Sequence, residues 1–458
     1  MGALPHALSP GPRRRRVPGG AAAGATDAGG EELNDRPTRG ARRFALVALL
    51  AAACTSPAVA VAQTSSASGP AEQEIRAQAD RESAQLDAWA KLYGDPLLDA
   101  HLAGIAEKLA RAGAEGPAFR VTVVRDPTLN AFALPNGRIY VHTGLLAALE
   151  NEAQLAMILG LEMTHVSSRH ALALARAPRG RPSASTIVAS AASVGLELAT
   201  DASAGAVDGV GTAALSATAV TIFGRGLPLA AEAAVYGRGD QLERDADAGG
   251  MDRLVRAGYD PKEASRAFDA LRRDLGNRGS LEIFYFGRRE QLAERVATTT
   301  ELLQTYFATA AAAPGTVRTT DEWRLRMPAV VRENARLDIQ AGRFALAADQ
   351  LDRVLAAAPR DPVAQLYYGD LYRLRSQRAQ SAQSAAEAAD WARQAIERYE
   401  HAARLDAAYA DPFRQLGLLY YQLQELGQAR AAFRQYLALK PDAPDAERVA
   451  EYLAELDD

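Results

Sequence analysis

The sequence predicts an α+β fold that is mainly α-helical, in which a helical domain with a small β-sheet precedes an α-helical repeat domain. Three patterns lead to this prediction. Apolar residues recur at helical spacing over residues 71–111, and they alternate with polar residues in FRVTVVRDP and GRIYVHT, as in strands. Beyond residue 332, a pattern of small and large residues repeats at an offset of 34. The 458 residues, 48% hydrophobic and 24% charged, suffice for two or three domains with apolar cores.

Residues 1–62 are predicted to be a disordered leader and a secretory signal peptide. The Gly-, Pro- and Arg-rich leader has no apolar periodicity and cannot build a core. Arg42 and Arg43 then precede an apolar run over residues 44–53, and small residues lead to an A-x-A site that ends at Ala62. This order is that of a signal peptide, and the apolar run is too short to span a bilayer. We therefore expect export to the periplasm.

Cys54 is the only cysteine of the chain and lies inside this signal, so we expect no disulfide in the exported protein. Anchoring through a lipid on Cys54 is the alternative to a soluble periplasmic product. Lipoprotein signals normally carry a larger aliphatic residue three positions before the cysteine, where this chain has Ala51. Without residues 1–62 the chain has 44 basic and 52 acidic residues, and this acidic balance does not favour a nucleic-acid partner.

Residues 71–317 are predicted to form the first domain. Its opening helical region ends at the Gly- and Pro-containing stretch 113–117. The predicted strand GRIYVHT follows an LPNG turn and is expected to be the neighbour of FRVTVVRDP in a small sheet. The helical pattern returns after Asn151, which is followed by Gln154 in the manner of a capping box. The Ala-, Gly- and Val-rich stretch 185–235 is predicted to form packed helices, with a membrane-touching hairpin as the alternative.

Residues 332–458 are predicted to be a domain of tetratricopeptide repeats. Such repeats are helical hairpins of 34 residues, with a small residue at a close-packed position and a larger residue four positions later. A 14-residue insertion, visible as RSQRAQSAQSAAEAAD, separates two of the units. A generic Ala-rich helical bundle is the alternative. The recurring pairs are Ala347 and Leu351, Ala395 and Tyr399, and Ala429 and Phe433.

Residues 161–165 nearly match the H-E-x-x-H motif of zinc proteases. In that motif two imidazoles lie one helical turn apart, and the glutamate beside them takes a proton from a zinc-bound water. Glu162 and His165 fill the base and second histidine positions here, whereas Leu161 stands at the first histidine. Taken alone, a helix histidine is more often packed or solvated than bound to a metal.

Further along the chain, QLERDADAGG places Glu243 and Asp247 one helical turn apart. Such a pair could supply a third metal ligand and a carboxylate that orients an imidazole. The competing interpretation is a solvated acidic face of a helix.

Three blocks together, NAFALP, GLL and ExxAD, resemble the zinc metallopeptidase family that includes the prenyl-protein protease and the periplasmic β-barrel-assembly-enhancing protease. The latter type also carries a signal peptide and C-terminal tetratricopeptide repeats, so the resemblance extends from about Tyr93 to the C-terminus. It implies a metallopeptidase-like domain, zinc as the cofactor of the family, and envelope proteins as clients.

The resemblance also implies a role for each matching residue. Glu162 would be the general base and His165 the second zinc ligand. Glu243 would be the third zinc ligand, and Asp247 the carboxylate behind a ligand.

Two positions depart from the family pattern. Leu161, which cannot bind a metal, stands at the first zinc ligand, and Arg289 stands where relatives often have a histidine. Catalytic zinc usually has three protein ligands, so we expect zinc binding to be weak or absent. A replacement ligand would have to be His142, His170 or a histidine from outside the chain. His142 is the only local candidate, because on a straight helix His170 would lie about 140° around the axis from His165.

The function predicted from these observations is that of a degenerate peptidase, a pseudoenzyme. It would bind envelope or outer-membrane protein clients through its repeats, for assembly or quality control. One alternative is an active zinc metalloendopeptidase that degrades misfolded envelope proteins, and another is a scaffold without an open cleft. Peripheral association with a membrane is left open.

The predicted signal peptide places the N-terminus of the exported chain near Gln63, directly after the A-x-A site. N-terminal sequencing of the protein recovered from the periplasm is expected to start there. A mature chain that starts at a lipid-modified Cys54 would establish the lipoprotein alternative instead, and an uncleaved chain in the cytoplasm would exclude both.

Overall fold

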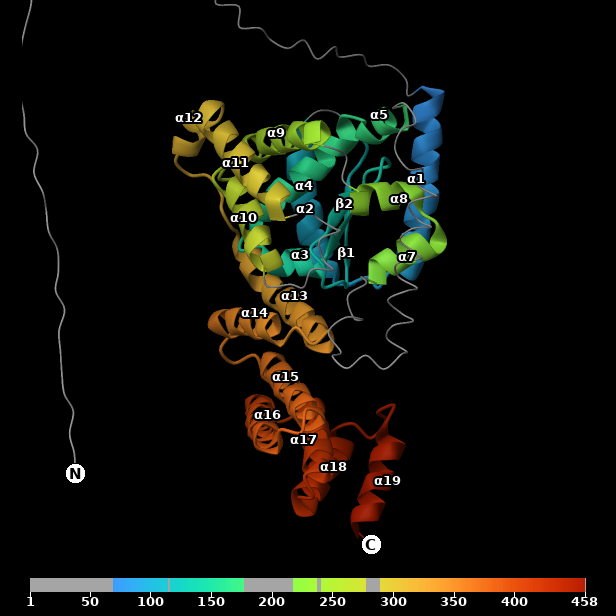
Figure 1. Cartoon of the computed structure of the whole chain (residues 1–458), viewed down its shortest axis with the longest axis vertical. Coiled ribbons are helices and arrows are strands. Elements are labelled where there is room, and N and C mark those ends of the chain that lie inside the picture. Colours follow the sequence, from blue (N-terminus) through green and yellow to red (C-terminus); the bar gives the residue numbers. More distant parts are fainter. Residues whose placement is uncertain (1–68, 114–115, 177–216, 237–239, 277–288, 458) are drawn as a thin grey trace, which may run out of the picture. The chain divides into compact units, whose positions relative to one another are not determined.

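The computed structural model describes residues 69–113, 116–176, 217–236, 240–276 and 289–457 (Figure 1). The predicted leader and signal peptide, including Cys54, lie outside the described residues, as does most of the Ala-, Gly- and Val-rich stretch 185–235. No helix in the described part of the chain is long and apolar enough to cross a membrane.

Helices surround one three-stranded sheet in the described residues, which confirms the predicted α+β, mainly α class. The strand order is β1-β3-β2, with β3 parallel to β1 and antiparallel to β2. The predicted turn joins β2 to β3 through Gly137, whose φ is 88°, and a Cβ there would lie 2.5 Å from the backbone oxygen of Ala118. Only glycine fits this turn. The strands are β1 Arg120–Val124, β2 Ala131–Ala133 and β3 Arg138–His142.

Both faces of the sheet are buried, and side chains alternate between them along each strand. Ile139 and Val141 belong to an apolar core shared with helices α2 and α4. Tyr140 belongs to a second core, shared with α1, α7 and α8 on the opposite face. The five helices are α1 Pro70–Trp89, α2 Pro96–Ala112, α4 Glu152–Ser167, α7 Ala217–Arg225 and α8 Pro228–Ala231.

Helix α4, which carries the motif at residues 161–165, begins at the predicted cap. The side chain of Asn151 accepts a hydrogen bond from the amide of Gln154 at 3.1 Å. The side chain of Gln154 in turn accepts from the amide of Glu150 at 2.8 Å, one residue earlier than in a capping box. Buried Glu263 accepts from the side-chain amides of Asn151 and Gln154, so α10 also holds the start of α4. The remaining elements of this part are α3 Thr143–Ala148, α5 His170–Arg176, the π-helical turn η1 Glu232–Tyr236, α9 Asp240–Arg256, α10 Glu263–Gly276, α11 Arg289–Thr305 and α12 Ala308–Ala312.

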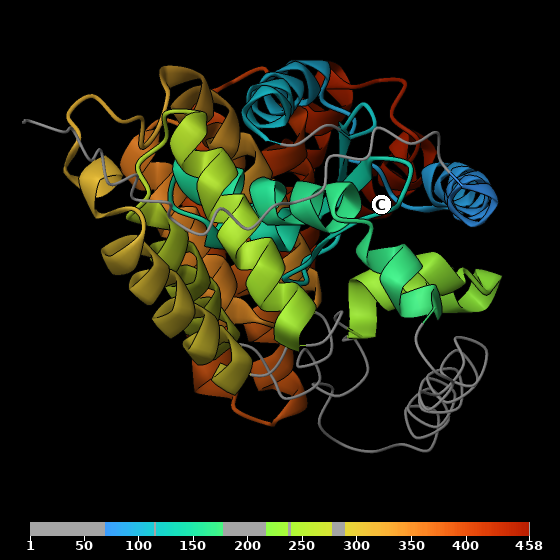
Figure 2. The ribbon, with the colours of Figure 1, turned by 90° about the horizontal axis from the view of Figure 1, so that it is seen from above.

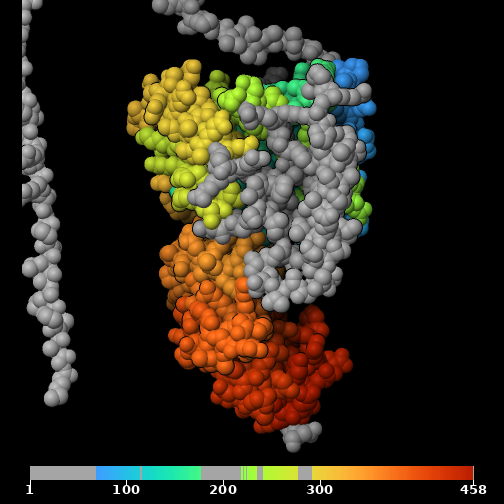
Figure 3. Space-filling view, viewed as in Figure 1, coloured from blue at the N-terminus to red at the C-terminus, as the bar shows by residue number. Residues whose placement is uncertain are grey.

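The C-terminal part folds as consecutive helical hairpins, coloured orange to red in Figures 1 and 3. In two of them a glycine in the first helix lies under an aromatic ring of the second. A Cβ on Gly369 would lie 2.3 Å from Cε1 of Tyr399, and one on Gly417 would lie 2.4 Å from Cδ1 of Phe433. The helices are α13 Asp321–Gln340, α14 Phe344–Ala357, α15 Pro362–Ser381, α16 Ala385–Leu405, α17 Ala410–Gln422, α18 Leu426–Leu439 and α19 Ala446–Asp457.

The predicted 14-residue insertion is helical and divides equally between two arms. Helices α15 and α16 have 20 and 21 residues, whereas their counterparts α17 and α18 have 13 and 14. Gly369 and Gly417 hold the same position from the start of their helices, so the extra turns lie at the tip of the α15–α16 hairpin. Where the extra turns begin, about midway along the hairpin, Tyr372 and Trp391 stack with ring centroids 5.4 Å apart, and Arg375 lies over Trp391 at 4.5 Å.

Helix α13 joins the two parts of the chain. Its first half, with Trp323 and Val330, packs in the core that contains α2 and α4, and its second half, with Ile339, packs against α14 and α15. The buried side chain of Asn334 lies 3.1 Å from the hydroxyl of Thr143 at the start of α3. This helix therefore begins between the two predicted domains, 71–317 and 332–458, and continues into the second range.

The glycine beneath Phe433 gives a test of the hairpin packing. Gly417→Ala should lower the free energy of unfolding by about 1–3 kcal/mol, because the added methyl group must displace a fully buried ring. Gly427→Ala is the matched control, since a Cβ there meets nothing within 4 Å and alanine is the better helix former. Urea unfolding of both variants makes the comparison, and equal stabilisation of the two would contradict the packing described.

Candidate active site

The candidate site lies where α9 crosses α4 (Figure 2). Both helices have glycines at the crossing. A Cβ on Gly250 of α9 would lie 2.9 Å from the amide nitrogen of Leu161, and a Cβ on Gly160 of α4 would lie 3.1 Å from the backbone oxygen of Gly250. The two backbones can approach so closely only because these side chains are missing. This approach brings the acidic residues of α9 to the motif on α4.

His165 and Glu243 face each other across the crossing. The Nε2 atom of His165 lies 3.6 Å from Oε2 of Glu243, and the imidazole is buried while the carboxylate is about one-quarter exposed. Two ligands of one tetrahedral zinc lie roughly 3.4 Å apart, given bonds of about 2.0–2.2 Å. The spacing of this pair is therefore that of two ligands of a single metal ion.

Glu162 lies beside the edge strand of the sheet. Its Oε2 accepts a hydrogen bond of 3.0 Å from the backbone amide of Ala133, the last residue of β2. The side chain is buried, so its carboxylate is held in a largely dry environment between α4 and the sheet. Glu162 thus contacts the sheet, while His165, less than one turn further along α4, contacts α9.

Asp247 is paired with a residue that the sequence reasoning did not identify, Arg295 of α11. Two guanidinium nitrogens of Arg295 donate to the Asp247 carboxylate, at 3.2 and 2.5 Å, and a third lies 3.6 Å from Glu243. Burial raises the pKa of Asp247, and the guanidinium of Arg295 opposes that rise. A fully buried carboxylate needs a cation beside it, but the sequence does not indicate which arginine or lysine supplies it.

His170 lies against His165, contrary to the expectation drawn from a straight helix. The helix ends at Ser167, and Arg169 adopts a left-handed backbone with φ of 56°, so the chain turns back before α5 begins. The Nδ1 atoms of the two imidazoles are 2.8 Å apart and the rings meet edge to face. A hydrogen bond at this distance needs one proton between the two nitrogens, so the tautomers of His165 and His170 are coupled.

His142, the suggested replacement ligand, lies on the wrong face of the sheet. Like Tyr140, it points towards α1, α7 and α8, whereas α4 covers the other face. Its Nδ1 is 2.8 Å from the hydroxyl of Thr128 and 3.6 Å from the carboxylate of Asp126. Burial lowers the pKa of His142, which is neutral in this setting. The hypothesis that His142 replaces the missing ligand was therefore wrong.

The residues present do not fit the usual zinc site. Leu161 is 1% exposed and belongs to the apolar core. Among the described residues, no group of three His, Cys, Asp or Glu side chains is placed to hold a metal ion. His165 and Glu243 thus form two-thirds of the ligand set that catalytic zinc requires. Arg289, the other departure, is the first residue of α11, and its side chain lies outside what the structure describes.

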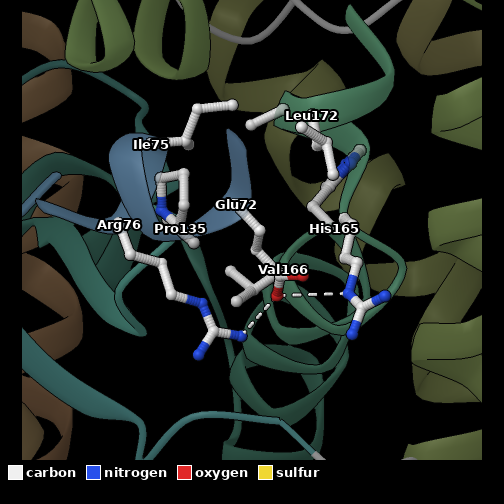
Figure 4. Close-up of a pocket in the computed structure, with 10 residues that line it drawn as sticks. Glu72, Ile75, Arg76, Pro135, His165, Val166 and Leu172 are labelled. Carbon is white, nitrogen blue, oxygen red and sulfur yellow. Dashed lines mark hydrogen bonds and ion pairs between the residues drawn. The ribbon is translucent and has the colours of Figure 1, made fainter. Parts of the chain in front are cut away.

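A small pocket adjoins His165 (Figure 4). Its water-accessible volume is about 30 Å³, which is room for little more than one water molecule. Its walls come from α1, from the end of β2 and the following turn, and from the junction of α4 with α5. The lining residues are Glu72, Ile75, Arg76, Ala133, Pro135, His165, Val166, Arg169, Ala171 and Leu172.

The first part of the chain is similar to proteins of known families. Residues 96–311 match peptidase family M48. The chain is 29% identical over 179 residues to the β-barrel assembly-enhancing protease of Escherichia coli K12, and 30% identical over 182 residues to a putative β-barrel assembly-enhancing protease of Vibrio cholerae. Each match covers 39% of this chain, and 33% and 34% of the respective relative.

A shorter match is to a mitochondrial metalloendopeptidase of Arabidopsis thaliana, 45% identical over 56 residues, which is 12% of each chain. Residues 96–311 thus resemble peptidase family M48, and the segment aligned with the bacterial relatives spans about a third of their length.

The Asp247–Arg295 pair gives a test of this site. Arg295→Met should lower the free energy of unfolding by about 3–5 kcal/mol, because it leaves a buried carboxylate unpaired. Arg244→Met is the matched control, since its partner Glu294 is exposed and such a pair contributes less than about 1 kcal/mol.

The loss of unfolding free energy in Arg295→Met should depend on pH. Burial raises the folded-state pKa of Asp247 above its unfolded value, so the destabilisation is greatest at neutral pH. It should shrink as the pH falls through the raised pKa, because the protonated carboxyl no longer needs a cation. Urea unfolding at several pH values measures this, and a loss that does not vary with pH would show that Asp247 is not the group affected.

Proposed function

We propose that this chain, with its peptidase family M48 domain, is a degenerate peptidase of the periplasm. It binds envelope or outer-membrane protein clients and assists their assembly or quality control. Two of its bacterial relatives are named β-barrel assembly-enhancing proteases, which supports clients of this class. The predicted signal peptide before Gln63 supports the periplasm as the place of action.

The single observation that carries the proposal is Leu161. It occupies the position of the first histidine in an otherwise matching motif, and its side chain is buried in the apolar core. An isobutyl group has no lone pair to offer a metal. Losing even a residue that only orients a ligand costs about 10- to 100-fold in metal affinity or activity, so losing a ligand itself should cost more.

The remaining polar groups support a site that is stable without metal. Glu162 is bonded to the Ala133 amide, and Asp247 is paired with Arg295. His165 is bonded to His170 and faces Glu243. Each of these buried groups therefore has a hydrogen-bond or ion-pair partner within the chain.

Client binding is assigned to residues 332–458, which we propose to be tetratricopeptide repeats, following a metallopeptidase-like domain over residues 71–317. The shared packing of Gly369 under Tyr399 and of Gly417 under Phe433 supports this, because repeats place equivalent side chains in equivalent contacts. Stacked helical hairpins present extended surfaces, which suit partly folded polypeptides.

An active zinc metalloendopeptidase is the alternative, and one distance in the structure favours it. The 3.6 Å between His165 and Glu243 is close to the spacing of two zinc ligands, and Glu162 stands next to His165 as a base would. Such an enzyme would need a third ligand from outside the described residues or from another molecule.

Restoring the missing ligand tests the proposal. The native chain is expected to bind zinc weakly or not at all, and Leu161→His should raise zinc affinity by at least about 100-fold, because it completes the three-ligand set. Glu243→Gln combined with Leu161→His is the matched control and should cancel most of the gain. Competition with a fluorescent zinc chelator measures all three proteins.

Casein cleavage by the native chain and by Glu162→Gln separates the two functions. The proposal expects no cleavage by either protein. Cleavage by the native chain that stops in Glu162→Gln would establish the active peptidase instead.

A further inference from the structure

Helix α1 forms one wall of the small pocket beside His165. Glu72, Ile75 and Arg76, all from the first two turns of α1, line this pocket opposite Leu172 of α5 (Figure 4). The side chains of Ile75 and Leu172 point towards each other across it. Access to His165 from this side is therefore closed by the chain's own first helix.

The second half of α1 is firmly attached to the rest of the domain. The side-chain amide of Asn136 donates to Asp80 at 2.8 Å, and the hydroxyl of Tyr140 donates to Asp87 at 3.0 Å. Glu82 accepts hydrogen bonds from two backbone amides at the start of α8, at 3.2 and 2.9 Å. Leu86 is fully buried in the second core.

The first half of α1 is held very differently. All residues of this helix are described, and its buried positions are Glu72, Ala79, Glu82, Ser83 and Leu86. Over residues 70–78, Glu72 is thus the one buried position. A segment with so little buried surface can open at a much lower free energy than the helix as a whole.

Glu72 is fastened to the turn that positions His170. Its Oε1 lies 3.2 Å from Nε of Arg169 and 2.8 Å from a guanidinium nitrogen of Arg76, contacts that Figure 4 marks with dashed lines. Arg169 has the left-handed backbone that returns the chain towards α4. The same ion pair therefore joins the first turn of α1 to the turn next to the two histidines.

We propose that the first half of α1 is a lid over the pocket at His165, latched by the Glu72–Arg169 ion pair and hinged near Ala79. With the latch closed, the pocket holds about one water molecule. With it open, residues 70–78 move away and the wall formed by Ile75 is removed, so an apolar side chain of a bound polypeptide can reach Val166 and Leu172. That use of the open pocket rests on the proposed function, whereas the lid itself does not.

Three full-length variants test the latch. Glu72→Gln removes the charge and keeps the size of the side chain. Glu74→Gln is the matched control, because Glu74 is an exposed glutamate on the same helix. Arg169→Glu repels Glu72, and adding Glu72→Lys to it should restore the pair with reversed charges.

Hydrogen–deuterium exchange and carbethoxylation of histidines are the two measurements. In Glu72→Gln, amide exchange over residues 70–78 should rise at least about tenfold, while residues 80–89 and the Glu74→Gln control keep native rates. Modification of His165 should rise several-fold as well. His142, fully buried on the other face of the sheet, should stay unmodified and so reports on global unfolding.

The results separate the lid from its competitors. Unchanged exchange over residues 70–78 in both Glu72→Gln and Arg169→Glu would overturn the latch. Faster exchange over the whole of residues 70–89, or modification of His142, would show loss of the fold rather than opening of a lid. Casein binding that does not increase in Glu72→Gln, with the lid demonstrably open, would count against the proposed function and not against the lid.

A crosslink gives an independent check in case these variants fold poorly. Ile75→Cys and Leu172→Cys, in a Cys54→Ser background without other thiols, are joined by a short bismaleimide. The crosslinked chain should show slower modification of His165 than the uncrosslinked chain. Equal rates would mean that His165 is reached by another route and would overturn the lid.

Discussion

The close crossing of α4 and α9 is the constraint on which the rest of the site depends. Gly160 and Gly250 remove the side chains that would otherwise separate the two backbones, and Leu161 fills the space next to them. The acidic residues of α9 reach the site through this approach: Glu243 lies beside His165, Asp247 is buried, and Arg295 of α11 pairs with Asp247. A larger residue at either glycine would separate all of these pairs at once.

The sequence was sufficient for the parts of the fold that rest on local chemistry. The cap at Asn151, the turn through Gly137 and the strand alternation around Val121 each depend on residues near in the chain, and the structure has them where the pattern put them. The 14-residue insertion was also visible, because comparison of the chain with itself needs no knowledge of packing. These features account for the class and the order of the elements.

The parts of the site that could not be predicted from the sequence depend on how turns and packed helices bring separate segments of the chain together. His170 was set aside because the helix was assumed to be straight, and a single left-handed residue at Arg169 reverses that conclusion. His142 was favoured because histidine is a metal ligand. Side chains alternate along β3, however, so His142 lies on the same face as Tyr140, opposite to α4. Arg295 lies 48 residues from Asp247, and no local pattern pairs two residues at that distance.

The lengthened α15–α16 hairpin has a consequence for how the C-terminal helices tolerate change. Seven residues in each arm turn a helix through about 700°, which is only about 20° short of two complete revolutions. The tip of the α15–α16 hairpin therefore keeps nearly the orientation relative to its base that the shorter α17–α18 hairpin has. Five extra residues per arm would have swung the tip by about 140° relative to the base. The insertion thus lengthens the hairpin by about two turns in each arm without rotating its tip relative to its base.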